Sequence, residues 1–151
     1  MSRVHVTTRI QAPVERVWET VMDPECLGEW VTIHRAVEEI SSRPMRRGST
    51  MEQTLHLRGV SFRVHWTLVD MQAPHHAEWT GEGPARSRAR ISYDLRADDG
   101  GGTQFEYTNE FTPPGGPLGT VASRVIVGAA SEREAERSLA RLKALLEKPA
   151  K

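Results

Sequence analysis

The chain has 151 residues, which is enough for one domain with a hydrophobic core and a modest cavity. Its 20 basic and 20 acidic residues cancel, which gives no reason to expect nucleic acid or an anionic membrane as its main partner. The single cysteine excludes an intrachain disulfide framework, and no apolar run approaches the roughly 20 residues of a membrane-spanning helix. The N-terminus also lacks a signal-peptide core, so we expect a cytoplasmic protein without stable membrane insertion.

The first 31 residues predict a strand followed by two short helices. Apolar and polar residues alternate over 4–10, which is the pattern of a strand with one apolar face. A short helix is expected after Pro13. Asp23 and Pro24 then suit the N-cap and the first position of a second short helix, which carries Trp30.

The middle of the chain predicts a series of strands joined by short turns. In most of them apolar side chains alternate with polar ones, which indicates a sheet that is buried on one face. Short connections, such as the glycine-rich turn at 98–102, favour antiparallel pairing. The predicted strands are 33–40, 50–58, 60–68, 76–82, 85–96 and 103–111.

The C-terminal residues 117–147 predict one long helix. Pro117 suits a first helical position, and apolar residues recur at helical spacing from there to Leu146. A helix of this length measures about 45 Å and is the one predicted element able to cover the sheet. We therefore expect an α+β fold in which a curved antiparallel sheet of about seven strands wraps around the helix. It would form a single domain over 1–148, with 149–151 as a loose tail.

Four segments carry a resemblance to a known superfamily. They are 10–18 (IQAPVERVW), 23–25 (DPE) with Trp30, the turn before Thr103, and 138–147 (SLARLKALLE). With them the chain resembles the helix-grip superfamily, also called START-like or SRPBCC, in its bacterial polyketide cyclase/dehydrase-like branch. The resemblance implies a pocket between the concave face of the sheet and the long helix, with loops and short helices at the mouth. It does not imply one activity, because members share a cavity rather than a catalytic motif.

Polar residues on otherwise apolar strand faces are the candidates for a binding site. Gln53 and Asn109 each follow the parity of apolar neighbours, and a buried amide needs a hydrogen-bond partner. Other core residues could provide the hydrogen-bond partner of either amide, and the aromatic residues could fill the core without forming a binding site. Together they describe an aromatic pocket with a few polar groups, as small-molecule sites have. The candidate cavity residues are Trp30, His34, Gln53, Leu55, Trp66, Trp79, Tyr93, Tyr107, Asn109, Val121 and Val125.

His34 has two possible placements. If Thr32 and His34 face inward, the imidazole lies near the pocket mouth and could bind or transfer a proton. If Val31 and Ile33 face inward, His34 lies on the surface, and the parity favours this placement slightly. The superfamily resemblance implies that residues after the second short helix lie near the mouth, which keeps the first placement open.

No pattern predicts a metal or a cofactor. The adjacent His75 and His76 point in different directions, and no cysteine or carboxylate cluster stands at ligand spacing, so we expect a solvated turn. The chain contains no glycine-rich phosphate loop, nucleophile elbow or paired carboxylates on the pocket face.

The outer face of the predicted sheet carries a row of arginines, including Arg86, Arg88 and Arg90. Glu78 and Glu110 fall on the same face of neighbouring strands, so cross-strand ion pairs explain the row more simply than nucleic acid does. Aromatic residues do not alternate with these arginines, as they would on a single-strand-binding sheet.

Three hypotheses about function follow. The favoured one is a binding protein for a hydrophobic or aromatic small molecule held between sheet and helix. The second is a cyclase- or aromatase-type enzyme in which Tyr107, Asn109, Gln53 or His34 orients an aldol-type cyclisation or dehydration. The third is an interaction or chaperone-like module, which a cavity filled by aromatic side chains would favour. The sequence does not set the oligomeric state.

Overall fold

The computed structural model describes residues 2–115 and 120–148, and the side chains of 2–115 and 123–148. Its seven strands form one sheet in the order β1-β7-β6-β5-β4-β3-β2, and every neighbouring pair is antiparallel. The strands are β1 (Ser2–Ile10), β2 (His34–Glu38), β3 (Thr50–Leu57), β4 (Val60–Gln72), β5 (His76–Glu82), β6 (Arg88–Ala97) and β7 (Thr103–Thr112).

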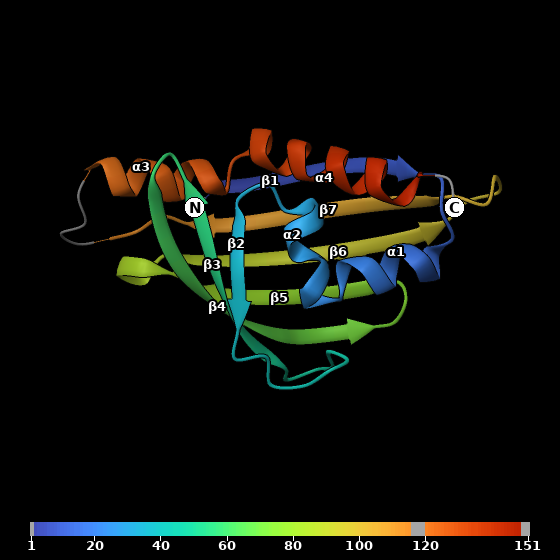
Figure 1. The fold of residues 1–151 in the computed structure, drawn as a ribbon, viewed down its shortest axis with the longest axis horizontal. Helices are drawn as coiled ribbons and strands as arrows, with labels where there is room; N and C mark the ends of the chain where they lie inside the picture. Colours follow the sequence, from blue (N-terminus) through green and yellow to red (C-terminus); the bar gives the residue numbers. More distant parts are fainter. Residues whose placement is uncertain (1, 116–119, 149–151) are drawn as a thin grey trace.

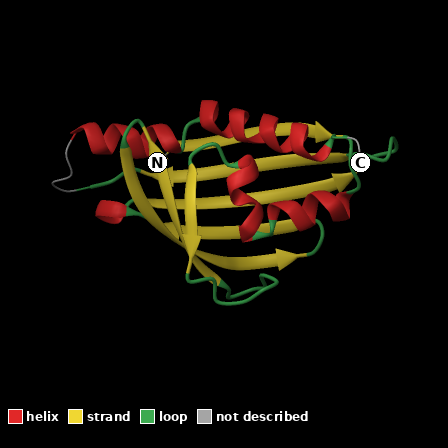
Figure 2. Ribbon diagram, viewed as in Figure 1, coloured by secondary structure: helices red, strands yellow, loops and turns green. Residues whose placement is uncertain are grey.

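The sheet is strongly curled. In Figure 1, β2 and β3 run across the direction of β6 and β7, and the chain's helices lie on the concave side and along the β1 edge. Figure 2 shows the same division between strands and helices. This is the helix-grip α+β fold that the sequence predicted, with a seven-stranded antiparallel sheet.

The N-terminal helices form where they were expected. They are α1 (Val14–Val21), the 3-10 turn η1 (Pro24–Cys26) and α2 (Leu27–Trp30). The Asp23 carboxylate accepts a hydrogen bond from the Glu25 N–H at 2.9 Å, which caps η1 as predicted. In Figure 1, α2 lies over the concave face of the sheet.

The prediction of one continuous C-terminal helix was wrong. The structure has α3 (Thr120–Ala129) and α4 (Glu132–Leu146), separated at 130–131. Ser131 begins α4 as its N-cap, and its hydroxyl accepts from the Glu134 N–H at 3.3 Å. The Ser-x-x-Glu spacing is a helix-start signal that the apolar periodicity obscured. The predicted start at Pro117 and the tail at 149–151 lie outside the described residues.

The predicted strand 85–96 begins later in the structure. Residues 84–86 form a 3-10 turn, η2 (Pro84–Arg86), and β6 starts at Arg88. Ala85 and Arg86 both have left-handed backbone angles, with φ of 52° and 65°. Residues with a side chain rarely adopt this backbone conformation, and a strand requires extended backbone angles. Neither residue could therefore continue the strand.

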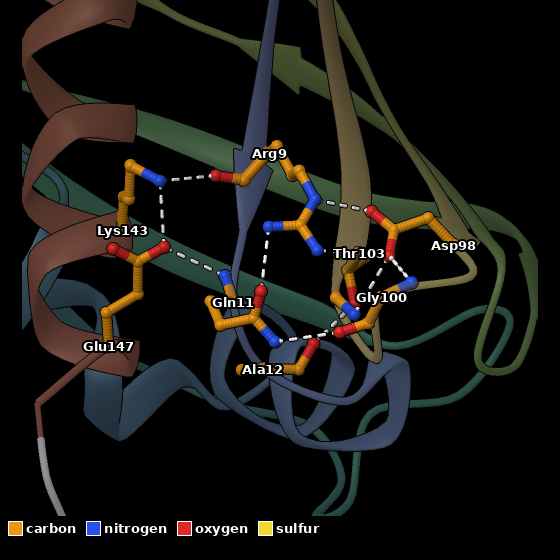
Figure 3. Close-up of polar contacts among 9 residues, drawn as sticks. Arg9, Gln11, Ala12, Asp98, Gly100, Thr103, Lys143 and Glu147 are labelled. Carbon is orange, nitrogen blue, oxygen red and sulfur yellow. Dashed lines mark hydrogen bonds and ion pairs between the residues drawn. The ribbon is translucent and has the colours of Figure 1, made fainter.

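One end of the sheet is closed by a polar cluster, shown in Figure 3. The Asp98 carboxylate accepts from Arg9 Nε at 2.6 Å and from the Gly102 N–H at 3.0 Å, so it ties β1 to the β6–β7 turn. The hydrogen bond from Arg9 holds the pKa of Asp98 well below its usual range. From α4, Lys143 donates to the Arg9 carbonyl at 2.7 Å, and Glu147 accepts from the backbone at 11. The cluster fixes the C-terminal end of α4 against the sheet.

Leucines of α4 bury its inner face. Leu139, Leu142 and Leu146 are each at most 3 % exposed and belong to the same core as Ile10 and Phe105. Within the described ranges, no helix has both the length and the apolar character needed to cross a membrane.

Candidate functional site

A cavity of about 130 Å³ lies between the concave face of the sheet and the helices. A single buried water needs only about 10–15 Å³ measured in the same way, so the space is large enough for a small organic molecule. Side chains of β3 to β7 form one wall, and residues from the α1 end, α2, α3 and α4 form the other. Most of the lining side chains are apolar or aromatic.

Strand register places the key side chains of the sheet wall in rows. Trp79 on β5 pairs with Ile91 on β6, which pairs with Asn109 on β7. In the next row, Tyr93 pairs with Tyr107, and their ring centroids are 6.3 Å apart. Paired residues in antiparallel strands point to the same face, so all of these side chains meet on the concave side.

Gly81 makes room for one of the aromatic walls. It pairs with Trp66 across β4 and β5, and a Cβ atom at position 81 would lie 2.6 Å from Cζ3 of the indole. Such a distance is far below van der Waals contact. The absence of a side chain at Gly81 therefore lets Trp66 lie close against the sheet.

Gln53 connects the cavity wall to His34 through two hydrogen bonds. The Trp66 indole N–H donates to Gln53 Oε1 at 2.9 Å. Because an indole nitrogen only donates, the amide must present its oxygen there and its nitrogen to His34 Nδ1, which lies 2.9 Å away. The Nδ1 atom is then the acceptor, and neutral His34 carries its proton on Nε2.

A β-bulge explains the position of His34. His34 pairs with Leu55 and Val37 pairs with Gln53, because the register shifts between 34 and 36. Both side chains therefore face inward, although simple alternation would place them on opposite faces. Ile33 lies in the turn before β2 and also lines the cavity. The inward placement of His34 is thus the one the structure has, and burial lowers the pKa of its imidazole.

The two tyrosines are protonated groups in the wall. Burial raises the pKa of Tyr107 to about 12, against a smaller lowering by a hydrogen bond from Asn109. Burial, with the nearby Tyr107, raises the pKa of Tyr93 even further. At neutral pH both hydroxyls therefore stay protonated and can donate a hydrogen bond to a carbonyl oxygen.

The structure brings most of the predicted site residues together. Eight line the cavity: Trp30, Gln53, Leu55, Trp66, Trp79, Tyr93, Tyr107 and Asn109. His34 contacts the Gln53 amide but is not part of the lining. Val125 is buried without lining the cavity, and the side chain of Val121 lies outside the described residues.

Several lining residues were missed from the sequence. Ile126 and Ala129 of α3, together with Glu134 and Ser138 of α4, line the cavity beside the sheet residues. Their helical spacing was visible, but which face of each helix meets the sheet depends on the break at 130–131. Glu134 Oε2 accepts from the Thr32 hydroxyl at 2.7 Å, so its carboxylate is held at one side of the cavity.

Polar groups on the outer face form pairs across strands. Arg90 Nη2 lies 2.8 Å from Glu78 Oε2, which is the type of cross-strand ion pair that was expected there. His75 is exposed in the turn, whereas His76 starts β5 and lies 2.7 Å from Asp94 on β6. Among the described residues, His, Cys, Asp and Glu side chains nowhere gather in threes that could hold a metal ion.

Comparison with known proteins agrees with this architecture. Residues 1–147 match the family described as polyketide cyclase / dehydrase and lipid transport. The uncharacterized protein Rv1546 of Mycobacterium tuberculosis is 24% identical over 131 residues, or 85% of this chain and 90% of that protein. Toxin Rv0910 of the same organism is 22% identical over 60% of this chain and 63% of its own length.

A solved structure supports the fold. The Zhui aromatase/cyclase from Streptomyces sp. R1128 superposes with a TM-score of 0.75 at 18% identity, covering 97% of this chain and 93% of that one. At this identity the likeness concerns the fold alone. The match over residues 1–147, together with this fold, shows that the chain belongs to the polyketide cyclase / dehydrase and lipid transport family.

Proposed function

We propose that the protein binds a hydrophobic or aromatic small molecule in the cavity between the sheet and the helices. The observation that carries the proposal is the cavity itself, about 130 Å³ with a mostly apolar and aromatic lining. Trp66 and Trp79 form part of its walls and do not fill it, which favours a ligand over a purely protein-binding role. The single thiol of Cys26 is free, which supports a reducing compartment such as the cytoplasm.

Native mass spectrometry of the protein purified from its own cells tests this proposal. We expect a co-purifying small molecule that a denatured sample releases. Ala129→Phe places a large side chain in the cavity from α3 and should abolish its retention. Val127→Phe is the matched control, because Val127 is 46 % exposed on the same helix and its variant should retain the molecule. Equal occupancy in the two variants would contradict the proposed location.

Catalysis of a cyclisation or dehydration in the same cavity is the second candidate. It is favoured by the family description and by the hydroxyls of Tyr93 and Tyr107 in the cavity wall, which remain available as donors at neutral pH. The two functions differ in turnover. If the released molecule is converted by the purified protein, Tyr107→Phe should remove most of the conversion while binding is retained.

A further inference from the structure

Hydrogen bonds join the cavity wall to a residue outside the lining, and we call the three residues involved the wall network. Gln53 and Trp66 line the cavity, whereas His34 does not. The Trp66 indole donates to Gln53 Oε1 at 2.9 Å, and the Gln53 amide nitrogen donates to His34 Nδ1, also at 2.9 Å. Because an indole nitrogen only donates, the orientation of the amide and the acceptor role of Nδ1 are both fixed. The wall network is complete only when Nδ1 carries no proton.

A proton on Nδ1 would leave the wall network without an arrangement that satisfies all its groups. An imidazolium ring donates from both nitrogens, so Nδ1–H would face the NH₂ group of Gln53. Rotation of the amide would offer its oxygen to His34 but would turn the NH₂ group toward the indole N–H of Trp66. In either orientation two donors face each other. Protonation therefore removes one hydrogen bond beside the cavity, and a buried polar group without a partner is costly.

His34 exchanges protons with solvent more readily than the rest of the network does. Its side chain is half-buried at the start of β2 and lies beside α2, where a Cβ atom added to Gly28 would be 3.5 Å from its Cδ2. Gln53 and Trp66 are only 5 % and 7 % exposed. The network thus extends from a titratable ring near the surface to the aromatic wall of the cavity.

Charged groups on the elements around His34 do not compensate a proton on its ring. They are Arg35 and Glu38 of β2, Glu29 of α2, Glu52 and His56 of β3, and Glu134, Arg137 and Arg141 of α4. In the described part of the chain, none of them forms a hydrogen bond or an ion pair with this imidazole. The Glu38 carboxylate is paired with Arg63, and the Glu52 carboxylate lies 2.6 Å from His65 Nδ1. The surroundings therefore favour neutral His34.

Trp66 is the member of the network that forms a face of the cavity. Its indole lies against Gly81 on β5, where a Cβ atom would be 2.6 Å from Cζ3. Since glycine has no side chain to restrain the ring from that strand, the hydrogen bond to Gln53 is the directional contact that orients the indole. Loss of this bond would let the ring turn and would change the shape of the wall.

We propose that His34 is a positioning residue that makes ligand binding in the cavity depend on pH. The neutral imidazole holds Gln53, and through it the Trp66 indole, in the arrangement that binds the ligand. Protonation releases the indole and weakens binding, so the cavity retains its ligand at neutral pH and gives it up in acid. The inference rests on the proposed binding function and adds how that binding is regulated.

The direction of the pH dependence follows from the form of His34 that supports binding. Burial lowers the pKa of His34 below the ordinary histidine value of about 6.5. A ligand that favours the neutral form lowers this pKa further, by reciprocal linkage. Affinity is therefore complete above about 6.5 and falls as the pH drops through the pKa of the ligand-free protein. Tyr93 and Tyr107 do not titrate in this range, because burial raises their pKa values.

Nuclear magnetic resonance tests the network in the ligand-free full chain. The indole ¹H–¹⁵N signal of Trp66, identified by its absence in Trp66→Phe, is followed between pH 8 and 5. We expect it to shift with the same midpoint as the His34 ring, whereas the signal of Trp18 on α1 should not follow that midpoint. His34→Asn offers an amide oxygen in place of Nδ1 and takes no proton, so its Trp66 signal should stay in place. His5→Asn, at an exposed histidine of β1, should keep the shift.

Equilibrium dialysis of 2-ethylnaphthalene tests the effect on binding. This probe has no titratable group, so any pH dependence belongs to the protein. We expect its Kd to rise about fivefold from pH 8 to pH 5 in the unaltered chain and in His5→Asn, but less than twofold in His34→Asn. His34→Leu lacks the acceptor at every pH, so its Kd should already be raised at pH 8. Circular dichroism at both pH values reports whether each protein is folded.

The outcomes separate this inference from the proposed function. A Trp66 signal that stays in place while His34 titrates would overturn the coupling, and the unaltered chain alone decides this if a variant does not fold. A shifting Trp66 signal with an unchanged Kd would overturn the control of binding and leave the binding function standing. Absence of binding at both pH values would overturn the proposed function, whereas the Trp66 titration would still show whether the network responds to acid.

Discussion

The protonation state of His34 affects the hydrogen bonds of the cavity wall. Its Nδ1 accepts from Gln53, which holds the Trp66 indole, and this chain of bonds requires a neutral imidazole. Protonation would turn Nδ1 into a donor facing the Gln53 amide nitrogen. The amide would then have to rotate and present its nitrogen to the indole N–H of Trp66, which also donates. Acid therefore opposes the arrangement that holds the wall together.

The free energy of unfolding should fall as the pH drops below about 6.5, the ordinary pKa of histidine. Burial lowers the pKa of His34 in the folded state, so below 6.5 the unfolded chain binds the proton first. This contribution to stability is complete above 6.5 and is lost as the pH falls through the lower folded value. Urea unfolding at pH 7.5 and 5.5 measures it.

His34→Gln removes the titrating group and should show a smaller loss over this range than the unaltered chain. His5→Gln is the control, because His5 is exposed on β1 and its replacement should leave the pH dependence unchanged. An equally steep loss in His34→Gln would show that other groups cause the acid sensitivity.

At the scale of elements, the break between α3 and α4 decides which side chains reach the cavity. Ala129 of α3 and Leu139 of α4 line it, whereas Leu142 and Leu146 of α4 fill the core beside the sheet. In a single continuous helix, the inward faces of the two halves would have a fixed orientation relative to each other. The break is stabilised by Ser131, whose hydroxyl replaces a hydrogen bond that the first turn of α4 lacks.

Loss of this cap should destabilise the protein by a measurable amount. Ser131→Ala is expected to lower the free energy of unfolding by about 1 kcal/mol, the usual effect of removing an N-cap hydroxyl. Ser131→Asp should retain the stability, since aspartate caps equally well and its charge favours a helix N-terminus. Denaturant titrations of the three proteins measure the difference, and equal losses in both variants would argue against a capping role.

At the scale of the whole molecule, the region that holds the fold together differs from the region that forms the cavity. The polar cluster of Figure 3 and the side chains of Leu142 and Leu146 close one part of the sheet. The cavity lies on the concave face, where its lining includes small residues such as Gly81 and Ala89. Stability and binding should therefore respond to different substitutions.

Leu142→Ala tests this separation. Leu142 is fully buried in α4 and does not line the cavity, so its truncation should cost about 2–5 kcal/mol of unfolding free energy. The Kd for 2-ethylnaphthalene should change less than threefold. Ile126→Ala, at a buried residue that does line the cavity, should weaken the same probe clearly. A large loss of binding in Leu142→Ala would mean that the two regions are not independent.

Local sequence patterns predicted the element types, their order, the antiparallel sheet and most residues of the sheet wall. These follow from local rules, because alternation along a strand decides which face each side chain occupies and short turns decide the pairing. Gln53 and Asn109 were identified as site candidates for this reason, as polar residues on apolar faces.

Other features depend on contacts between residues that are distant in the chain, and they became visible in the folded structure. The bulge after His34 turned that residue inward, and Trp66 lies close against the sheet because the register places Gly81 opposite it. The helical residues of the lining depend on how α3 and α4 pack against the sheet. Periodicity within one element cannot specify the element that packs against it. Whether a buried amide finds a hydrogen-bond partner, as Gln53 does, is likewise a property of the packed fold.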